Sequence, residues 1–179
     1  MSSADTARLA TSFKAKRTLV KTSLLALAAA FEMVSRNSPD MKAELAEWDS
    51  GRVFTVGVLP DGPSITMRKE SDGLHYLGTG QHDADLKMLF KNVDSALMAL
   101  IGMIGAHTAF AEHRAIIHGS LYEAMQINRA MVIVQKFLLP GPVLKRITKR
   151  PPVMSAHDYV IKARVMTGLA AVMLKNARK

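Results

Sequence analysis

The first third of the chain shows a helical spacing of apolar residues. They recur at steps of three and four, with Lys16 as the one interruption: Leu9, Phe13, Val20, Leu24, Leu27, Phe31 and Val34. This spacing places them on one side of a long helix. The sequence Asn37-Ser38-Pro39-Asp40 ends that helix, and Asp40 is predicted to cap a short second helix from Met41 to about Trp48.

The spacing changes to a period of two after Trp48. Residues 53–59 are mostly β-branched or apolar, and apolar and polar side chains alternate along 65–68, 74–76 and 86–91. Turn sequences rich in Pro, Asp and Gly separate the first three segments. The pattern predicts four antiparallel strands joined by short turns, with one apolar and one polar face.

Helical and extended segments alternate in the second half of the chain. Asn92 or Asp94 is predicted to cap a helix that ends near Ile101, and residues 114–118 read as a fifth short strand. Ser120-Leu121-Tyr122-Glu123 matches a capping box, in which the hydroxyl and the carboxylate each accept a hydrogen bond from a free backbone amide. The helix that it opens is expected to reach Leu139.

The C-terminal segment is predicted to form a basic linker at 145–152 and a last helix from Ala156 to about Asn176. Pro140-Gly141-Pro142 stops the preceding helix. One side of the last helix is apolar and carries Tyr159, Val160, Ala163, Met166, Ala170, Met173 and Leu174.

Charge is distributed unevenly along the chain. The net charge of +9 divides into +4 for residues 1–36, −3 for 37–144 and +8 for 145–179. Such basic ends attract anionic lipid headgroups or nucleic acid. The chain has no cysteine, which excludes disulfides and thiolate chemistry. The apolar stretch 23–34 is too short to span a bilayer, and it reads either as part of the first helix or as the core of a signal peptide.

A series of motifs follows in a characteristic order through the central part of the chain. Trp48 precedes a strand hairpin, Asp83-Ala84-Asp85-Leu86-Lys87-Met88 forms a strand marked by acidic residues, and Asp94-Ser95-Ala96-Leu97 opens a helix. Ile117-His118-Gly119 then ends a strand and leads into Ser120-Leu121-Tyr122-Glu123-Ala124-Met125. In this order the chain resembles the sterol-carrier-protein-2 family over residues 41–139.

The resemblance implies an α+β fold with a five-stranded, mainly antiparallel sheet covered by helices around an apolar tunnel. The chain would divide into a basic amphipathic helix at 1–40, a lipid-binding domain at 41–139, and a basic linker with a C-terminal helix at 140–179. The family binds sterols, fatty acids, acyl-CoAs or phospholipids, and a bacterial branch is an accessory factor in ubiquinone biosynthesis. We therefore expect a non-catalytic carrier or presenter of an apolar lipid or quinone-like ligand, located in the cytoplasm and peripheral at the inner membrane.

The implied tunnel would be lined by apolar side chains of the strands and the central helices. They are Ile65, Met67, Leu74, Tyr76, Leu86, Met88, Phe90, Leu97, Ile101, Met103, Ile104, Met125, Met131 and Phe137. The pattern of residues alone leaves an ordinary filled core open as the alternative. Gly102-Met103-Ile104-Gly105 has the spacing of an RNA-binding loop but no basic residue, and a flexible lip at the tunnel mouth is expected instead.

A compact basic cluster, Lys145, Arg146, Lys149 and Arg150, is expected to contact an anionic membrane or a membrane-bound biosynthetic assembly. A solvated helix face is the alternative reading. A nucleic-acid-binding or structural adaptor with a filled core is a second function class, although no aromatic residue for base stacking lies within 145–150. The six histidines form no metal-binding pair, so no catalytic residue, metal or cofactor is expected.

Overall fold

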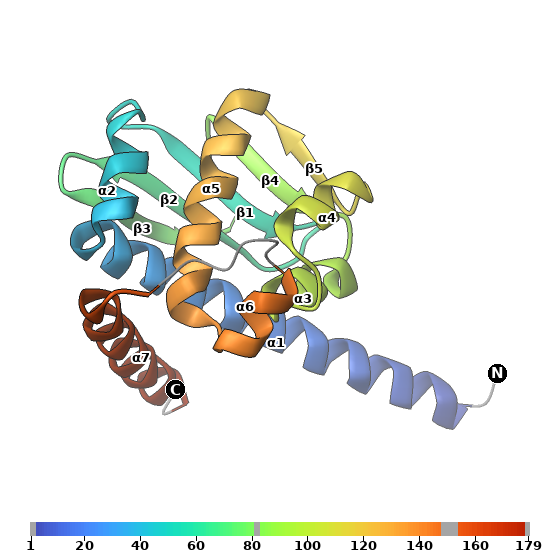
Figure 1. Ribbon diagram of the computed structural model, residues 1–179. Helices are drawn as coiled ribbons and strands as arrows, with labels where there is room; N and C mark the ends of the chain where they lie inside the picture. The colour runs from blue at the N-terminus through green and yellow to red at the C-terminus, as the bar shows by residue number, and fades with distance from the viewer. Residues whose placement is uncertain (1–2, 81–82, 148–153, 178–179) are drawn as a thin grey trace.

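The structure is a computed structural model that describes residues 3–80, 83–147 and 154–177. Figure 1 shows the arrangement of its helices and strands. In chain order the elements are α1 (Ser3–Asn37), α2 (Pro39–Ala46), β1 (Val53–Val58), β2 (Ser64–Glu70), β3 (Gly73–Thr79), β4 (Leu86–Phe90), α3 (Val93–Leu100), α4 (Ala106–Ala111), β5 (Ala115–His118), α5 (Leu121–Leu138), α6 (Gly141–Ile147) and α7 (Ala156–Ala177).

The five strands form one mixed sheet in the order β3-β2-β1-β4-β5. β1 and β4 are parallel, whereas the other neighbouring pairs are antiparallel. The predicted α+β class with a five-stranded, mainly antiparallel sheet is confirmed, but the expectation that β4 continues a series of hairpins is wrong. After β3 the next strand, β4, pairs with β1 and not with β3. On the two sides of this connection the Thr66 hydroxyl donates to the Gly80 carbonyl and the Val53 amide donates to Asp85.

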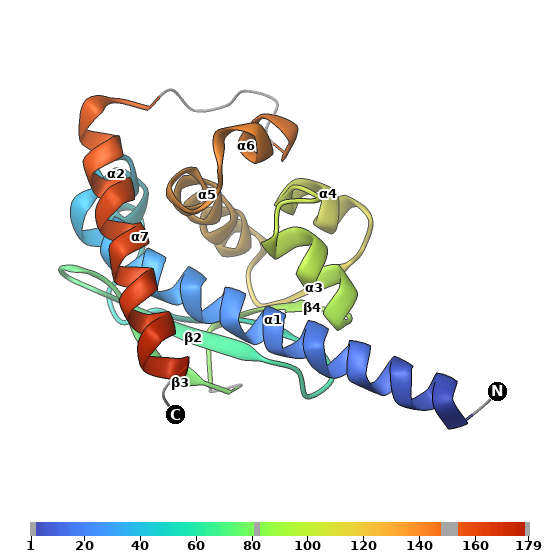
Figure 2. The same ribbon diagram turned by 90° about the horizontal axis from the view of Figure 1, so that it is seen from below.

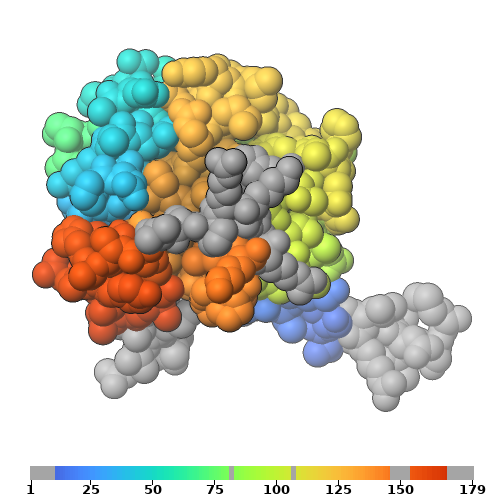
Figure 3. All heavy atoms as spheres, in the orientation of Figure 1, coloured from blue at the N-terminus to red at the C-terminus, as the bar shows by residue number. Residues whose placement is uncertain are grey.

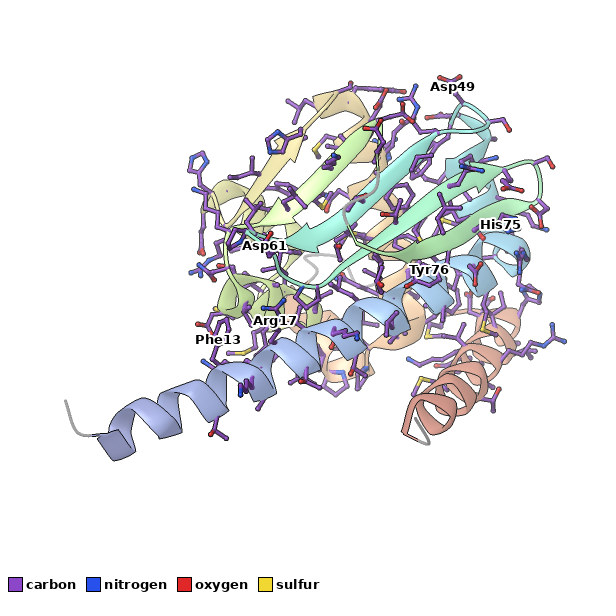
Figure 4. All side chains as sticks on the ribbon, turned by 180° about the vertical axis from the view of Figure 1, so that it is seen from behind. Phe13, Arg17, Asp49, Asp61, His75 and Tyr76 are labelled. Atoms are coloured by element: carbon purple, nitrogen blue, oxygen red, sulfur yellow. The ribbon has the colours of Figure 1, made fainter. Side chains whose placement is uncertain are left out.

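The helices lie on one face of the sheet, as Figures 1 and 2 show. Phe54 of β1 points into this layer. Its ring makes edge contacts with Phe31 of α1 and with Trp48 after α2, and the ring centroids are 5.9 Å apart in each pair. No helix covers the opposite face in Figure 4. On that side Thr55 and Thr66 are buried and share a hydrogen bond of 2.8 Å between their hydroxyls.

The long helix α1 contributes to the core and covers one edge of the sheet. Its window Thr11–Asn37, with a mean hydropathy of 1.4, is long and apolar enough to cross a membrane. The residues with the predicted spacing from Val20 to Val34 are nevertheless fully buried in the core. The N-terminal part of α1 projects beyond the sheet, where Phe13 is exposed (Figure 4).

Three helix starts test the predicted caps. Asn92 caps α3 as expected, because its side chain accepts a hydrogen bond of 2.8 Å from the Ser95 amide. Ser38, not Asp40, caps α2, since Pro39 begins the helix two residues earlier than predicted. Ser120 occupies the N-cap position of α5 without making a side-chain cap bond.

The sequence pattern did not indicate α4 and α6. α4 has only six residues, too few to show a helical period. α6 begins at Gly141-Pro142, which was interpreted as a stop signal; a proline is equally compatible with the first turn of a new helix.

Candidate functional site

The predicted tunnel residues occupy three kinds of position. Eight are buried between the sheet and the helices: Ile65, Met67, Leu74, Leu86, Met88, Phe90, Met131 and Phe137. Tyr76, Leu97 and Ile104 are partly buried against the same core. Ile101, Met103 and Met125 are 39%, 50% and 39% exposed. The eight buried residues and their neighbours form a continuous apolar layer, and the three exposed residues lie outside it; whether any of them contacts a ligand stays a prediction.

Helix α5 is packed unequally on its two flanks. It packs closely on α1, α2 and α7, while its contacts with α3, α4 and β5 are marginal or absent among the described residues. Leu121 and Met125 are four residues apart and therefore lie on one flank of α5. Both are exposed, and Ile117 of β5 is only half-buried although its strand partner Met88 is buried. The helical layer is therefore incompletely closed above β5.

A pocket of about 230 Å³ lies on the other flank of α5, between α2 and the starts of β1 and β4. Its lining consists of Glu47, Trp48, Asp49, Arg52, Leu86, Tyr122, Glu123, Gln126 and Ile127. Leu86, Ile127 and Trp48 are also buried members of the hydrophobic core. The floor of the pocket is therefore the outer surface of the apolar layer.

Charged side chains surround this pocket. Arg52 forms an ion pair with Glu123 of α5 and a second one, of 3.1 Å, with Asp49. Arg129 binds Glu44 at 2.9 Å and lies 3.9 Å from Glu47. Glu123 thus joins α5 through an ion pair to Arg52, the residue before β1, and the predicted capping box is not formed. Among these six residues four are acidic and two are basic, which leaves the rim with a net charge of −2.

Two hydrogen-bond donors in the pocket lining have no partner. The Trp48 indole nitrogen Nε1 and the Gln126 amide nitrogen Nε2 are buried without an acceptor. A buried polar group without a partner costs about 1–3 kcal/mol of stability, so an acceptor that reached these nitrogens would stabilise the site. Gln126 comes from the second turn of α5 and Trp48 follows α2, so two separate elements bring these residues to the lining of the same pocket.

Among the residues of this pocket, only Leu86 has a position in the sequence that predicts a ligand contact. The single tryptophan of the chain, Trp48, was used as a landmark of the family pattern and not as a site residue. Gln126 occupies a buried position in a helix that otherwise buries mostly apolar side chains. A polar residue at a core position needs a partner, but α5 also buries Asn128 and Gln135, so this signal does not single out Gln126.

A cluster of possible metal ligands lies at the β2–β3 turn. Glu70, Asp72 and His75 bring one ligand atom each within 4.8 Å of one another. Both nitrogens of His75 are engaged, with Asp72 at 2.6 Å and with Arg36 at 3.2 Å (Figure 4 labels His75). The hydrogen bond from His75 holds the pKa of Asp72 below its ordinary value. These contacts account for the cluster as a network that joins the turn to α1.

Helix α7 presents an apolar side to solvent. Tyr159, Val160 and Met166 are each at least 50% exposed, while Ile161 and Val165 are buried against the body of the protein. The predicted apolar side is therefore the outer side, and the side chains of Ala170, Met173 and Leu174 lie outside the described residues. In the basic cluster, Lys145 is exposed on α6; the side chain of Arg146, and Lys149 and Arg150 entirely, lie outside the described residues.

A buried ion pair fixes α7 to α5. Lys136 Nζ lies 2.9 Å from Asp158, and both side chains are at least nine-tenths buried. Burial alone raises the pKa of Asp158, but the Lys136 ammonium and the hydrogen bonds from Ser155 outweigh it, so the pKa stays below its ordinary value. Lys162 adds a hydrogen bond of 2.9 Å to the Leu139 carbonyl.

Solved structures of sterol carrier protein 2 domains are similar to this chain, whereas neither the protein-family models nor the curated proteins searched contain a match. A structure described as "UbiJ-SCP2 Ubiquinone synthesis protein" is 13% identical, with a TM-score of 0.47, over 63% of this chain and 90% of the other. Sterol carrier protein 2 of Yarrowia lipolytica is 17% identical, with a TM-score of 0.43, over 64% and 93%. The Aedes aegypti protein in complex with palmitate is 13% identical, with a TM-score of 0.41, over 64% and 94%.

Proposed function

We propose that this protein binds an apolar, lipid-like molecule without catalysis, with the apolar part of the ligand between the sheet and the helices. The observation that carries the proposal is the pocket beside α5, whose floor is made of the core side chains Leu86, Ile127 and Trp48. A ligand that enters there meets the apolar layer directly. The pocket alone is smaller than typical ligand sites of about 300–1,000 Å³, so a long ligand must displace side chains of the layer.

The side chains that would move are suited to this. Met88 and Met131 lie buried in the layer. Methionine is unbranched and adapts to cavities of different shape. We propose that α5, which has few contacts with α3, α4 and β5 among the described residues, moves slightly outward to admit the ligand. Figure 3 shows parts of α5 and of the α3–α4 segment on the same face of the molecule.

Uptake of a lipid from vesicles tests this proposal. Neutral vesicles that contain a radiolabelled long-chain alcohol are mixed with the protein and then removed by flotation. We expect the wild type to retain about one labelled molecule per protein, and the variant Gln126→Trp, which fills the pocket, to retain much less while its circular dichroism spectrum is unchanged. Equal retention by both would place the ligand elsewhere, and no retention by the wild type would refute binding.

We further propose that the ligand is collected at an anionic membrane surface. Two features support this: the exposed apolar side of α7, and the basic segment that begins at Lys145. Apolar contact combined with basic charge is what peripheral binding requires. Each basic residue near an anionic surface contributes about 1 kcal/mol, and salt weakens this attraction.

Flotation with anionic and neutral vesicles tests the membrane proposal. The wild type is expected to float with anionic vesicles at low salt, and a variant with Lys145, Arg146, Lys149 and Arg150 changed to Ala is expected to stay in solution. Equal flotation of the two proteins would refute a role for the basic cluster. Binding of the wild type to DNA or RNA in preference to vesicles would favour the nucleic-acid alternative.

A further inference from the structure

The pocket beside α5 carries information about the head of the ligand. We infer, on the basis of the proposed lipid-binding function, that this pocket selects molecules with an uncharged, oxygen-bearing head, a hydroxyl or a carbonyl, over molecules with a carboxylate head. Trp48 and Gln126 are the residues assigned to recognise the oxygen. Glu47, Asp49 and Glu123 are assigned to reject negative charge.

The free donors define what the head must offer. The indole Nε1 of Trp48 can only donate a hydrogen bond, and the amide Nε2 of Gln126 is also a donor. Both atoms are buried and unpartnered, on side chains that are 8% and 5% exposed and that line the same pocket. A hydroxyl or carbonyl oxygen can accept a hydrogen bond from a donor of this kind. A purely hydrocarbon ligand would leave both of them without a partner.

The surrounding charges define what the head must not carry. Arg52 is the one cation in the pocket lining, and Glu123 and Asp49 already neutralise it. Arg129 is likewise engaged by Glu44 and lies near Glu47. A carboxylate would therefore meet three acidic side chains with no unpaired cation to offset them, and like charges placed together discriminate against a ligand. A hydroxyl head avoids this repulsion and can donate a hydrogen bond to a neighbouring carboxylate.

The position of the pocket relative to the core orients the ligand. Leu86 and Ile127 separate the polar rim from the apolar layer and belong to both. A head held by Trp48 and Gln126 therefore directs its hydrocarbon tail past these two side chains and between the sheet and α5. Asp49 marks the pocket end of the sheet, which lies opposite the end marked by Asp61 in Figure 4.

A matched pair of probes tests the inference. Hexadecan-1-ol and hexadecanoate have the same chain length and differ only in the head, and the protein's single tryptophan, Trp48, reports occupancy of the pocket through its fluorescence. At low salt and slightly alkaline pH we expect the alcohol to bind at least about tenfold more tightly, because the carboxylate faces uncompensated like charge. In the variant Gln126→Leu the affinity for the alcohol should fall by about tenfold, the effect of one lost hydrogen bond.

Two double variants test whether the acidic residues of the pocket cause the preference for the alcohol. Glu47→Gln with Asp49→Asn removes two exposed carboxylates from the pocket and should shift the preference toward hexadecanoate several-fold. Asp61→Asn with Asp83→Asn removes two exposed carboxylates elsewhere and should change nothing. Equal binding of the two probes, or an equal shift in both double variants, would overturn the inference and leave lipid binding intact. Failure of both probes to bind the wild type would overturn the proposed function and the inference with it.

Discussion

The two edges of the sheet are covered in different ways. At the β3 edge, α1 side chains complete the hydrogen bonding of the strand: Glu32 accepts from the Tyr76 amide and Ser35 from the Leu74 amide, each at 3.0 Å. The contact is so close that a side chain on Gly73 would meet the Ser35 oxygen at 2.6 Å. At the β5 edge no residue is fully buried, and Leu121 and Met125 of α5 remain exposed nearby.

This difference separates a rigid half of the molecule from an adaptable half. At the β3 edge the amides of Leu74 and Tyr76 are satisfied by α1 side chains, and regions held in this way are expected to resist local opening. The β5 half has half-buried apolar residues and few contacts between helices, which are the features of regions that open locally. A protein that admits a ligand into its core needs both kinds of region. The ligand packs against the rigid half, and the adaptable half moves to let it enter.

The largest expected effect on stability comes from truncating a buried side chain in the rigid half. Phe31 is fully buried between α1 and the sheet and contacts Phe54. Phe31→Ala should lower the free energy of unfolding by about 3–5 kcal/mol. Urea unfolding measures this loss, and Met103→Ala, at an exposed position in the other half, is the matched control with an expected loss below about 1 kcal/mol. Similar losses in the two variants would contradict the division.

The attachment of α7 is the next test. Lys136→Ala leaves Asp158 buried without its partner cation and should cost about 3 kcal/mol. Lys136→Met together with Asp158→Leu replaces the pair with apolar side chains and should recover most of the loss. Urea unfolding of the two variants separates the cost of an unpaired charge from the loss of packing. A double variant as unstable as Lys136→Ala would contradict this account.

The same ion pair predicts a pH dependence. The pKa of Asp158 is lower in the folded protein than in the unfolded chain, so the unfolded chain binds the proton first as the pH falls. The stabilisation is therefore complete well above pH ~3.9, the usual pKa of an aspartate, and is lost as the pH falls through the lowered pKa of the folded state. Asp158→Asn should show a shallower loss of stability than the wild type over this acidic range. Parallel stability curves would refute the assignment.

The smallest effects sharpen the distinction between buried and exposed methionines. Met131 is buried in the layer, and Met131→Trp should destabilise the ligand-free protein by about 1–3 kcal/mol through overpacking. Met125 is exposed on the loosely packed flank, and Met125→Trp should change stability by no more than about 0.5 kcal/mol. Thermal unfolding of the two variants measures both effects. A large loss in Met125→Trp would show that this flank is packed as tightly as the layer.

The fold was more predictable than the site, for physical reasons. Periodic apolar residues determined α1, α5 and each strand, because burial of one face imposes the period directly. The parallel pairing of β1 with β4 was missed, since alternation specifies a strand but not its neighbour. The pocket residues were missed because Trp48, Arg52 and Gln126 come from separate elements and share no sequence pattern. Glu123 was assigned to a cap because local spacing cannot show that Arg52 lies within its reach.

Native mass spectrometry of the freshly purified protein tests the central claim most directly. We expect the wild type to carry an additional mass of a few hundred daltons, within the range of a single lipid-like molecule, that is released on denaturation. Gln126→Trp should lack this mass while its charge-state distribution still shows a folded protein. A wild-type protein found only at the mass of its bare chain, both as purified and after exposure to lipid vesicles, would contradict the claim that the layer beside α5 holds a ligand.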